Sequence, residues 1–203
     1  MDAAALVDGA LVEGAAISGG SLEAELDELE LVGCHLTGVA FTGAVLRGLE
    51  LVDCVLEDCE LSGTTLEAAI LRRVRFDRCR MTGFTAPEIA ATHVRFDDCT
   101  LAGAWLRMGR FDHCTFESSD LTESDLYGAS LTASGVLRCT LDRAEISGSS
   151  LRDVALHGTT IEGVTGVPGV QDVLIAPEQI VSFSVPVLRA AGFRVTDEHD
   201  EPA

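Results

Sequence analysis

Hydrophobic residues recur at every fifth position along most of this chain. The 28 positions reached from Leu26 to Ile161 in steps of five hold 17 Leu, 5 Phe, 2 Ile, 1 Met, 1 Val and 2 Ala, and no polar residue interrupts them. The position two residues earlier is small in most cases. A period of five fits neither an α-helix at about 3.6 residues per turn nor a flat strand at about 2. The pattern predicts a coil with short straight sides, each of which points two side chains into one interior.

Two exceptions to the small position support a shared interior. Phe84 precedes Ala86, and Ile89 precedes Ala91, so a large residue at the small position accompanies a small residue at the large one. Protein interiors are close-packed, and the total volume matters more than which position supplies it. Both positions are therefore expected to line the same core.

Two further patterns give the corners and the length of one coil. Glycine, which tolerates the positive φ of a tight turn, often stands two residues after the large position. The segment Val74–Cys79 recurs as Val94–Cys99, with five of six residues matching at a spacing of twenty. Twenty residues correspond to four sides, and this period places Phe76, Phe96 and Phe116 in one column. We predict an all-β solenoid of about seven regular coils, stabilised by contacts between neighbouring coils.

Residues 1–165 are predicted to form this β-helix, with regular repeats in 26–163 and a degenerate, frame-shifted first coil in 5–24. The residues expected to point inward in the first coil are Val7, Val12, Ile17 and Leu22. The step from Leu22 to Leu26 is four rather than five, which indicates a one-residue deletion.

The C-terminal part breaks the repeat. Residues 166–195 are predicted to contain a final strand at Val173–Ile175 and a capping helix that begins at Pro177 and stops before Gly192. Pro186 is expected to kink or split that helix. The acidic tail 196–203 is expected to be disordered.

The charge balance narrows the function. The chain has 203 residues, with 33 acidic side chains, 14 basic ones, all arginine, and a net charge of −19. This charge excludes a basic nucleic-acid-binding surface as the dominant feature. No apolar run approaches the roughly 20 residues that span a bilayer, and the acidic N-terminus lacks the positive region of a signal peptide. We expect a cytoplasmic protein that neither binds nucleic acid directly nor attaches to a membrane.

The sequence offers no catalytic constellation. It contains no phosphate-binding loop, no Gly-x-Ser-x-Gly motif and no plausible nucleophile triad. An interior filled by large side chains also leaves few polar groups in a cleft. We therefore predict a non-enzymatic protein without a cofactor.

The repeat resembles that of the pentapeptide-repeat proteins, whose five-residue unit has the form Ala-(Asp/Asn)-Leu-x-x. The clearest copies here are Ser119–Glu123 and Ser124–Gly128. The resemblance covers nearly the whole chain and implies a right-handed, four-sided β-helix. The segment from Ile175 to Phe193 resembles the family's C-terminal cap, whose helix forms a tail-to-tail homodimer in several members. For this chain, the resemblance implies a homodimer formed through the helix residues Ile180, Phe183, Val187 and Leu188.

The resemblance also has functional implications. One branch of the family resembles B-DNA in width, helical hand and negative charge, binds type II topoisomerases such as DNA gyrase, and confers resistance to quinolones or other gyrase poisons. Some members of that branch project loops for this contact, whereas the register here has no insertion from Leu26 to Ile161. The fold alone does not specify the function. We expect a DNA-mimicking rod that binds a type II topoisomerase, and the alternative is a scaffolding repeat protein with another protein partner.

Acidic residues recur in outward columns. The twenty-residue period places one ladder beside the phenylalanine column and a mixed column, in which Arg78 separates two acids, next to it. Like charges at about 4.8 Å repel each other and add nothing to folding. One interpretation is a phosphate-like track that the partner recognises, and the other is a solvated face that neighbouring arginines neutralise. The residues of this candidate track are Glu57, Asp77, Asp97 and Glu117 in the ladder, with Asp58 and Asp98 in the mixed column.

A belt of arginines lies in the middle of the rod. Residues 1–70 have a net charge of −13, whereas residues 71–115 have a net charge of +3. The belt either binds an anion or, as we favour, pairs with local acids. It consists of Arg72, Arg73, Arg75, Arg78 and Arg80.

The remaining candidates have ordinary structural explanations. All seven cysteines occupy the small inward position, which predicts reduced core thiols rather than a zinc site. His93 and His113 share an outward column, where two surface histidines are expected in preference to a weak metal site, so no metal is predicted. Trp105 and Tyr127 are outward, either as interface hot spots or as scattered surface aromatics.

Overall fold

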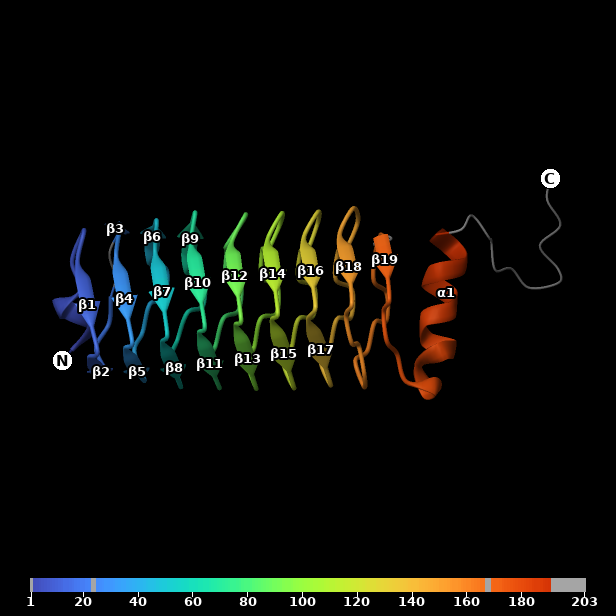
Figure 1. Cartoon of the computed structure of the whole chain (residues 1–203), viewed down its shortest axis with the longest axis horizontal. Coiled ribbons are helices and arrows are strands. Elements are labelled where there is room, and N and C mark those ends of the chain that lie inside the picture. The colour runs from blue at the N-terminus through green and yellow to red at the C-terminus, as the bar shows by residue number, and fades with distance from the viewer. Residues whose placement is uncertain (1, 23–24, 167–168, 191–203) are drawn as a thin grey trace, which may run out of the picture.

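The protein is a parallel β-solenoid of about eight coils with one short helix at its C-terminal end, as the sequence predicts (Figure 1). The computed structural model describes residues 2–22, 25–166 and 169–190, with the side chains of residues 186, 187, 189 and 190 excepted. Each coil contributes one segment to each of four faces, which we number in chain order. The fold class predicted from the five-residue period is confirmed.

Two of the faces are continuous parallel sheets. The first face is nine-stranded, in the order β1 (Leu11–Glu13), β4 (Glu30–Val32), β7 (Glu50–Val52), β10 (Ile70–Arg72), β12 (Ala90–Thr92), β14 (Arg110–Asp112), β16 (Ser130–Thr132), β18 (Ser150–Arg152) and β19 (Gly169–Gln171). The second face is seven-stranded and comprises β2 (Ala16–Ser18), β5 (His35–Thr37), β8 (Val55–Glu57), β11 (Arg75–Asp77), β13 (Arg95–Asp97), β15 (Thr115–Glu117) and β17 (Gly135–Leu137).

The other two faces rest largely on isolated bridges. The third face is a column of single bridges from Ser21 to Thr160. The fourth face begins as a three-stranded sheet of β3 (Glu25–Asp27), β6 (Val45–Arg47) and β9 (Thr65–Glu67) and continues as single bridges to Thr165. All pairings are parallel, so every residue lies beside its equivalent in the next coil.

The register confirms the twenty-residue coil. Leu31 pairs with Leu51, and Leu51 pairs with Leu71. At the N-terminal end Val12 pairs with Leu31, nineteen residues on, as the one-residue deletion requires. A second such deletion, which the sequence analysis missed, lies in the last coil, where Leu151 pairs with Val170.

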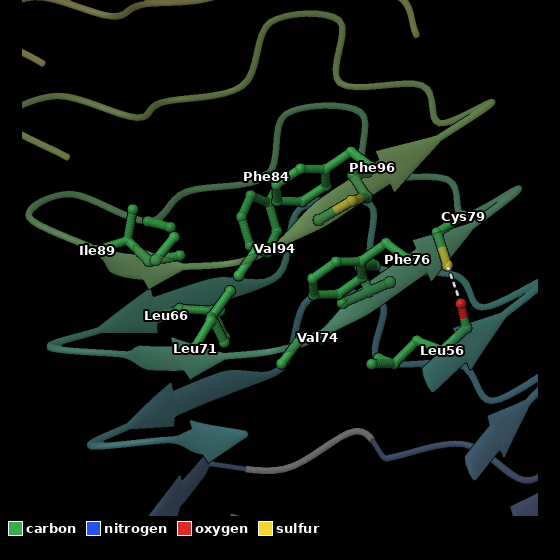
Figure 2. Packing of buried hydrophobic residues seen from close by; sticks show 14 of the residues in the cluster. Leu56, Leu66, Leu71, Val74, Phe76, Cys79, Phe84, Ile89, Val94 and Phe96 are labelled. Atoms are coloured by element: carbon green, nitrogen blue, oxygen red, sulfur yellow. Dashed lines mark hydrogen bonds between the residues drawn. The ribbon is translucent and has the colours of Figure 1, made fainter. Parts of the chain in front are cut away.

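The interior is built from the two predicted positions. Every large position from Leu26 to Leu141 is buried, and every small position from Leu29 to Thr159 is buried too. Figure 2 shows Phe84 and Ile89 among the large residues of the neighbouring coil, where they fill the volume that two alanines leave in the same coil. The Phe76 and Phe96 rings stack with centroids 4.9 Å apart, and a third ring continues the column at 4.6 Å.

Thiols and hydroxyls at the small position also link successive coils. The Sγ of Cys79 donates to the carbonyl oxygen of Leu56 at 3.4 Å (Figure 2), and the Oγ of Ser119 donates to that of Phe96 at 3.2 Å. In both cases the acceptor lies twenty-three residues earlier, in the preceding coil. All seven cysteines are buried free thiols. Burial raises the pKa of Cys114 and of Cys139 to about 11, which makes these thiols unreactive.

The corners accept more residue types than the glycine pattern suggests. The predicted glycines do have positive φ, but so do eighteen other residues, among them Asp53 at 55° and Arg78 at 51°. The backbone N–H of Asp53 donates to the carbonyl oxygen of Arg72 in the next coil at 3.0 Å. Such bonds between coils hold a left-handed conformation that costs a non-glycine residue about 1–2 kcal/mol.

The N-terminal end is closed differently from the prediction. Val7 was expected to point inward, but it is exposed, and Ala3 and Leu6 fill the end of the core instead. A short 3-10 helix, η1 (Ala3–Ala5), brings them there, and the side chain of Asp2 accepts a hydrogen bond from the backbone N–H of Ala4. The repeat ends here because the first coil has no neighbour on its outer side, and a cap covers its core instead.

The last strand at the C-terminal end lies earlier in the chain than predicted. The last strand is β19, and the segment expected as a strand contributes only a single bridge, from Leu174 to Ala155. A 3-10 turn, η2 (Pro177–Gln179), leads into α1 (Ile180–Ala190), which continues through Pro186 without a break. The expected tail 196–203 lies outside the described residues. Within the described part of the chain, no helix has the length and hydrophobicity needed to cross a membrane.

A buried glutamine joins this cap to the last coil. The Nε2 of Gln179 donates to the carbonyl oxygens of Leu156 at 2.8 Å and Thr159 at 2.9 Å, and its Oε1 accepts from the backbone N–H of Ala176. Gln179 lies twenty residues after Thr159 and twenty-three after Leu156, so it takes the place that a core thiol or hydroxyl would take in a further coil. The side chain satisfies carbonyl groups that the end of the stack would otherwise leave unpaired.

Candidate protein-binding surfaces

The acidic ladder lies on the second face, with the spacing that the sequence indicates. Glu57, Asp77, Asp97 and Glu117 are successive register partners on β8, β11, β13 and β15. Their exposure is uneven. The side chains of Asp77 and Asp97 are 7% and 14% exposed, whereas those of Glu57 and Glu117 are about 30% exposed.

Arginines pair with the centre of this ladder. Arg75 binds Asp77 at 2.9 Å and reaches across to Asp97 in the next coil at 3.2 Å. Arg95 binds Asp97 at 3.1 Å and Glu117 at 3.2 Å. The middle of the ladder is therefore a network of mixed charges rather than a row of exposed carboxylates.

The mixed column beside the ladder is also partly paired. The Nε of Arg78 binds Asp58 at 2.9 Å, and its Nη1 binds Asp77 at 2.8 Å. The hydrogen bond from Arg78 lowers the pKa of Asp58, and the same contact raises the pKa of Arg78. Asp98 is exposed and has no ion pair with another residue that the structure describes.

The rest of the arginine belt pairs locally, as the sequence analysis favoured. Arg73 binds Asp53 at 2.5 Å, and this hydrogen bond lowers the pKa of Asp53. The remaining pairs of the belt, both at 3.5 Å, are Arg72 with Glu50 and Arg80 with Glu60. An anion that used the belt would have to displace these carboxylates.

The least compensated acids lie at the N-terminal end. In this region Arg47 is shared by Glu25 at 3.1 Å, Asp27 at 3.4 Å and Glu67 at 3.3 Å. Four other acids of the first two coils have no ion pair among the described residues: Asp8, Glu13, Glu28 and Glu30. The candidate acidic site did not include them, although the net charge of −13 in residues 1–70 was the signal that pointed to this end.

The capping helix presents an apolar face at the other end. Ile180 is 57% exposed and Leu188 is 40% exposed, whereas Phe183 packs against the core of the rod. The side chain of Val187, the fourth predicted dimer contact, lies outside the described ones. Between α1 and the last coil lies a cleft of about 880 Å³, whose lining includes Ile161, Val164 and Val185.

Exposed aromatic residues gather on the fourth face. Trp105 and Tyr127, which the sequence marks as outward, are both about half exposed. Arg107 lies between them, and Met108 stands beside them at the corner. Arg107 was not among the predicted surface residues, although the twenty-residue period places it in the same column as Tyr127.

The two histidines that were considered for a weak metal site lie on the surface of the rod. His93 and His113 lie in one column, with ring centroids 4.8 Å apart. Nδ1 of His113 lies 3.0 Å from Asp112. Across the described ranges, no group of three or more His, Cys, Asp or Glu is arranged to hold a metal ion.

Comparison with known proteins identifies the repeat. The family model described as pentapeptide repeat region matches residues 29–106, and that described as pentapeptide repeats (8 copies) matches residues 95–132. No curated protein matches the chain significantly. Among solved structures, the full-length plasmid-mediated fluoroquinolone resistance protein QnrB1 is 15% identical, with 89% of this chain and 99% of that chain covered and a TM-score of 0.45.

Two further solved structures come from other settings. A pentapeptide repeat protein of the Arabidopsis thaliana thylakoid lumen is 21% identical, with 53% of this chain and 72% of that chain covered and a TM-score of 0.37. HetL of the cyanobacterium Nostoc sp. strain PCC 7120, involved in heterocyst differentiation regulation, is 17% identical, with 86% and 89% covered and a TM-score of 0.31. The five-residue period, the four-faced solenoid and the matching family models agree: this chain belongs to the pentapeptide-repeat family.

Proposed function

We propose that this protein is a non-enzymatic binding protein that mimics DNA toward a type II topoisomerase, with DNA gyrase as the first candidate. The observation that carries the proposal is the charge density of the N-terminal coils. Residues 1–70 have a net charge of −13, and at about 4.8 Å per coil they extend over roughly 17 Å. Duplex DNA carries about ten phosphates over the same length.

The ion pairs in the middle of the ladder change which acids we expect the partner to contact. The centre of the ladder is neutralised, so Asp77 and Asp97 serve as structural ion-pair partners. The recognition surface then consists of the free acids of the first two coils, such as Glu13, Glu28 and Glu30, extended by Glu57 on the second face. A partner groove that binds phosphates by arginine and lysine would meet a comparable field here. Resistance to gyrase-targeting antibiotics would follow if the rod displaces DNA from the drug-sensitive complex.

The test is a gyrase supercoiling assay with the purified protein, with and without a fluoroquinolone. The triple variant Glu13→Gln, Glu28→Gln, Glu30→Gln should raise the half-inhibitory concentration at least tenfold. A control variant removes the same charge elsewhere, through Glu88→Gln, Asp153→Asn and Glu162→Gln, and should change it less than twofold. The proposal fails if the wild type neither inhibits nor protects gyrase at micromolar concentration, or if both variants lose equally.

A second candidate function is scaffolding through another protein partner. Two observations favour it: the paired centre of the ladder and the aromatic cluster around Arg107. A rod that binds such a partner would leave gyrase unaffected and would lose its partner when the aromatic cluster is changed.

Under either function we propose a homodimer through α1. Exposed Ile180 and Leu188 are the contacts to change, because Phe183 also holds the cap on the rod. The double variant Ile180→Asp, Leu188→Asp should sediment as a monomer, whereas Ser182→Asp beside the cleft serves as a control for added charge. A wild-type protein that sediments as a monomer would remove the dimer from the proposal.

A further inference from the structure

Two histidines of adjacent coils lie side by side on the surface of the rod. His93 follows β12 and His113 follows β14, so both occupy the corner between the first and second faces. Their ring centroids are 4.8 Å apart, and the ring planes are inclined by 44°. Both residues are exposed, and no other pair of histidines among the described residues is in ring contact.

Hydrogen bonds between coils fix the backbone of both histidines. Each residue has a positive φ, 55° for His93 and 53° for His113. The backbone N–H of His93 donates to the carbonyl oxygen of Asp112 at 2.9 Å, and that of His113 donates to the carbonyl oxygen of Thr132 at 3.0 Å. Because these bonds join each corner to the next coil, the spacing of the two imidazoles follows from the stacking of the coils.

This spacing suits two imidazoles that bind one metal ion. Zinc lies about 2.0–2.1 Å from a histidine nitrogen, which places the centroid of that ring about 3.2 Å from the metal. At ligand angles of about 90–110°, as in octahedral and tetrahedral geometries, the two centroids are about 4.5–5.2 Å apart. The observed separation of 4.8 Å lies within this interval. Side-chain rotation then suffices to direct one nitrogen of each ring toward a shared ion, without movement of the backbone.

The surrounding side chains leave suitable ring nitrogens free. Nδ1 of His113 lies 3.0 Å from Oδ1 of Asp112, an arrangement in which the carboxylate accepts from Nδ1–H and Nε2 carries no proton. The ring of His93 has no hydrogen-bond partner among the described residues. Arg73, the preceding residue in this column, binds Asp53 one coil further back at 2.5 Å and so extends away from His93. The net charge of −19 attracts cations to the rod as a whole.

We propose that His93 and His113 form a two-histidine site for a divalent transition-metal ion of the copper, nickel and zinc group. Nε2 of His113 and one ring nitrogen of His93 are the protein ligands, and water fills the remaining positions. Imidazole suits all three ions, and Cu²⁺ binds most tightly among them. The site is open rather than a closed structural centre, since the described ranges contain no group of three or more His, Cys, Asp or Glu arranged to hold a metal ion. The ion joins two adjacent coils, and because the unfolded chain does not hold the rings together, binding stabilises the folded rod.

Isothermal titration calorimetry of the full chain with Ni²⁺ tests the site. We expect saturable binding of one ion per chain. His93→Asn and His113→Asn should each weaken this binding at least tenfold, because each variant removes one of the two ligands, while asparagine tolerates the positive φ of the corner. With Cu²⁺, electron paramagnetic resonance should show two coordinated nitrogens in the wild type and one in each variant. Ni²⁺ should raise the melting temperature of the wild type and leave that of both variants unchanged.

The matched controls are His35→Asn and His157→Asn, which remove exposed histidines that lie outside the pair. Each should change the affinity for Ni²⁺ less than twofold. Excess Ca²⁺ should not displace Ni²⁺, because Ca²⁺ takes oxygen ligands rather than imidazole. The proposal is overturned if neither Ni²⁺ nor Cu²⁺ binds stoichiometrically, if His93→Asn or His113→Asn binds as the wild type does, if a control loses as much as these variants, or if Ca²⁺ displaces the ion. None of these outcomes depends on gyrase, so the metal site and the DNA-mimic proposal fail or stand separately.

Discussion

Gln179 is the side chain on which the attachment of the C-terminal cap depends most directly. The substitution Gln179→Leu replaces the polar amide by an apolar group of similar size and removes three hydrogen bonds, two to carbonyl oxygens of the last coil and one from the backbone N–H of Ala176. A buried group left without its partner costs about 1–3 kcal/mol. Because water can reach the end of the rod and satisfy part of this demand, we expect a total loss of about 2–4 kcal/mol in the stability of the cap.

Hydrogen–deuterium exchange followed by mass spectrometry measures this loss locally. Since about 1.4 kcal/mol corresponds to a factor of ten, peptides from α1 should exchange roughly 30- to 1000-fold faster in the variant. Peptides from the central coils should keep their protection, because each coil contacts only its neighbours. Gln171→Leu, at an exposed position of β19, is the control and should leave α1 unchanged. Unchanged exchange in α1 of Gln179→Leu would refute the role assigned to this side chain.

The remaining predictions concern the interior. Leu106→Asp buries a carboxylate at a position that is 2% exposed and should lower the melting temperature by about 10–20 °C or prevent folding, whereas Ala102→Asp at an outward position should have little effect. The Oγ of buried Ser124 has no hydrogen-bond partner among the residues that the structure describes, so Ser124→Ala should be neutral or stabilise by up to about 1 kcal/mol in urea unfolding. Ser119→Ala should cost about 1–3 kcal/mol, because the backbone N–H of Cys99 loses its acceptor; equal effects of the two serine variants would contradict the assignment. The thiols should react with DTNB at pH 8 only after denaturation. Because folding raises the pKa values of Cys114 and Cys139, the unfolded chain loses these protons first, and the melting temperature should fall as pH rises from about 9 toward 11.

The repetitive part of the fold could be predicted closely because one physical requirement recurs in every coil. A residue such as Leu106 or Phe96 faces the same interior as its equivalents twenty residues away, so a single misplacement would show as a break in the pattern. The ends could not be predicted in the same way. Val7 continues the pattern in sequence, and Val173–Ile175 has the composition of a strand, but a coil with one neighbour gains less from repetition than from a cap that covers it.

The candidate surfaces were harder to predict than the core. The period places Asp77 and Asp97 in an outward column, yet it does not state how far an arginine side chain reaches, and Arg75 extends to the carboxylate of the next coil. Exposure therefore depends on side-chain conformations that a column alignment does not contain. Gln179 was missed for another reason. Its position fits the start of a helix, and only its separation of twenty residues from Thr159 along the sequence indicates that it completes the core.

The invariant register along the middle of the rod has a consequence for its length. Between Leu31 and Leu151, equivalent residues on the first face are always twenty positions apart. Deletion of residues 77–96 would therefore join Phe76 to Asp97, and every remaining inward side chain would still point inward and every outward one outward. Such a chain should fold into a rod one layer shorter, with both closing segments intact. The length of the rod can therefore change by whole coils. Duplication or deletion of twenty residues would achieve this without any substitution in the interior.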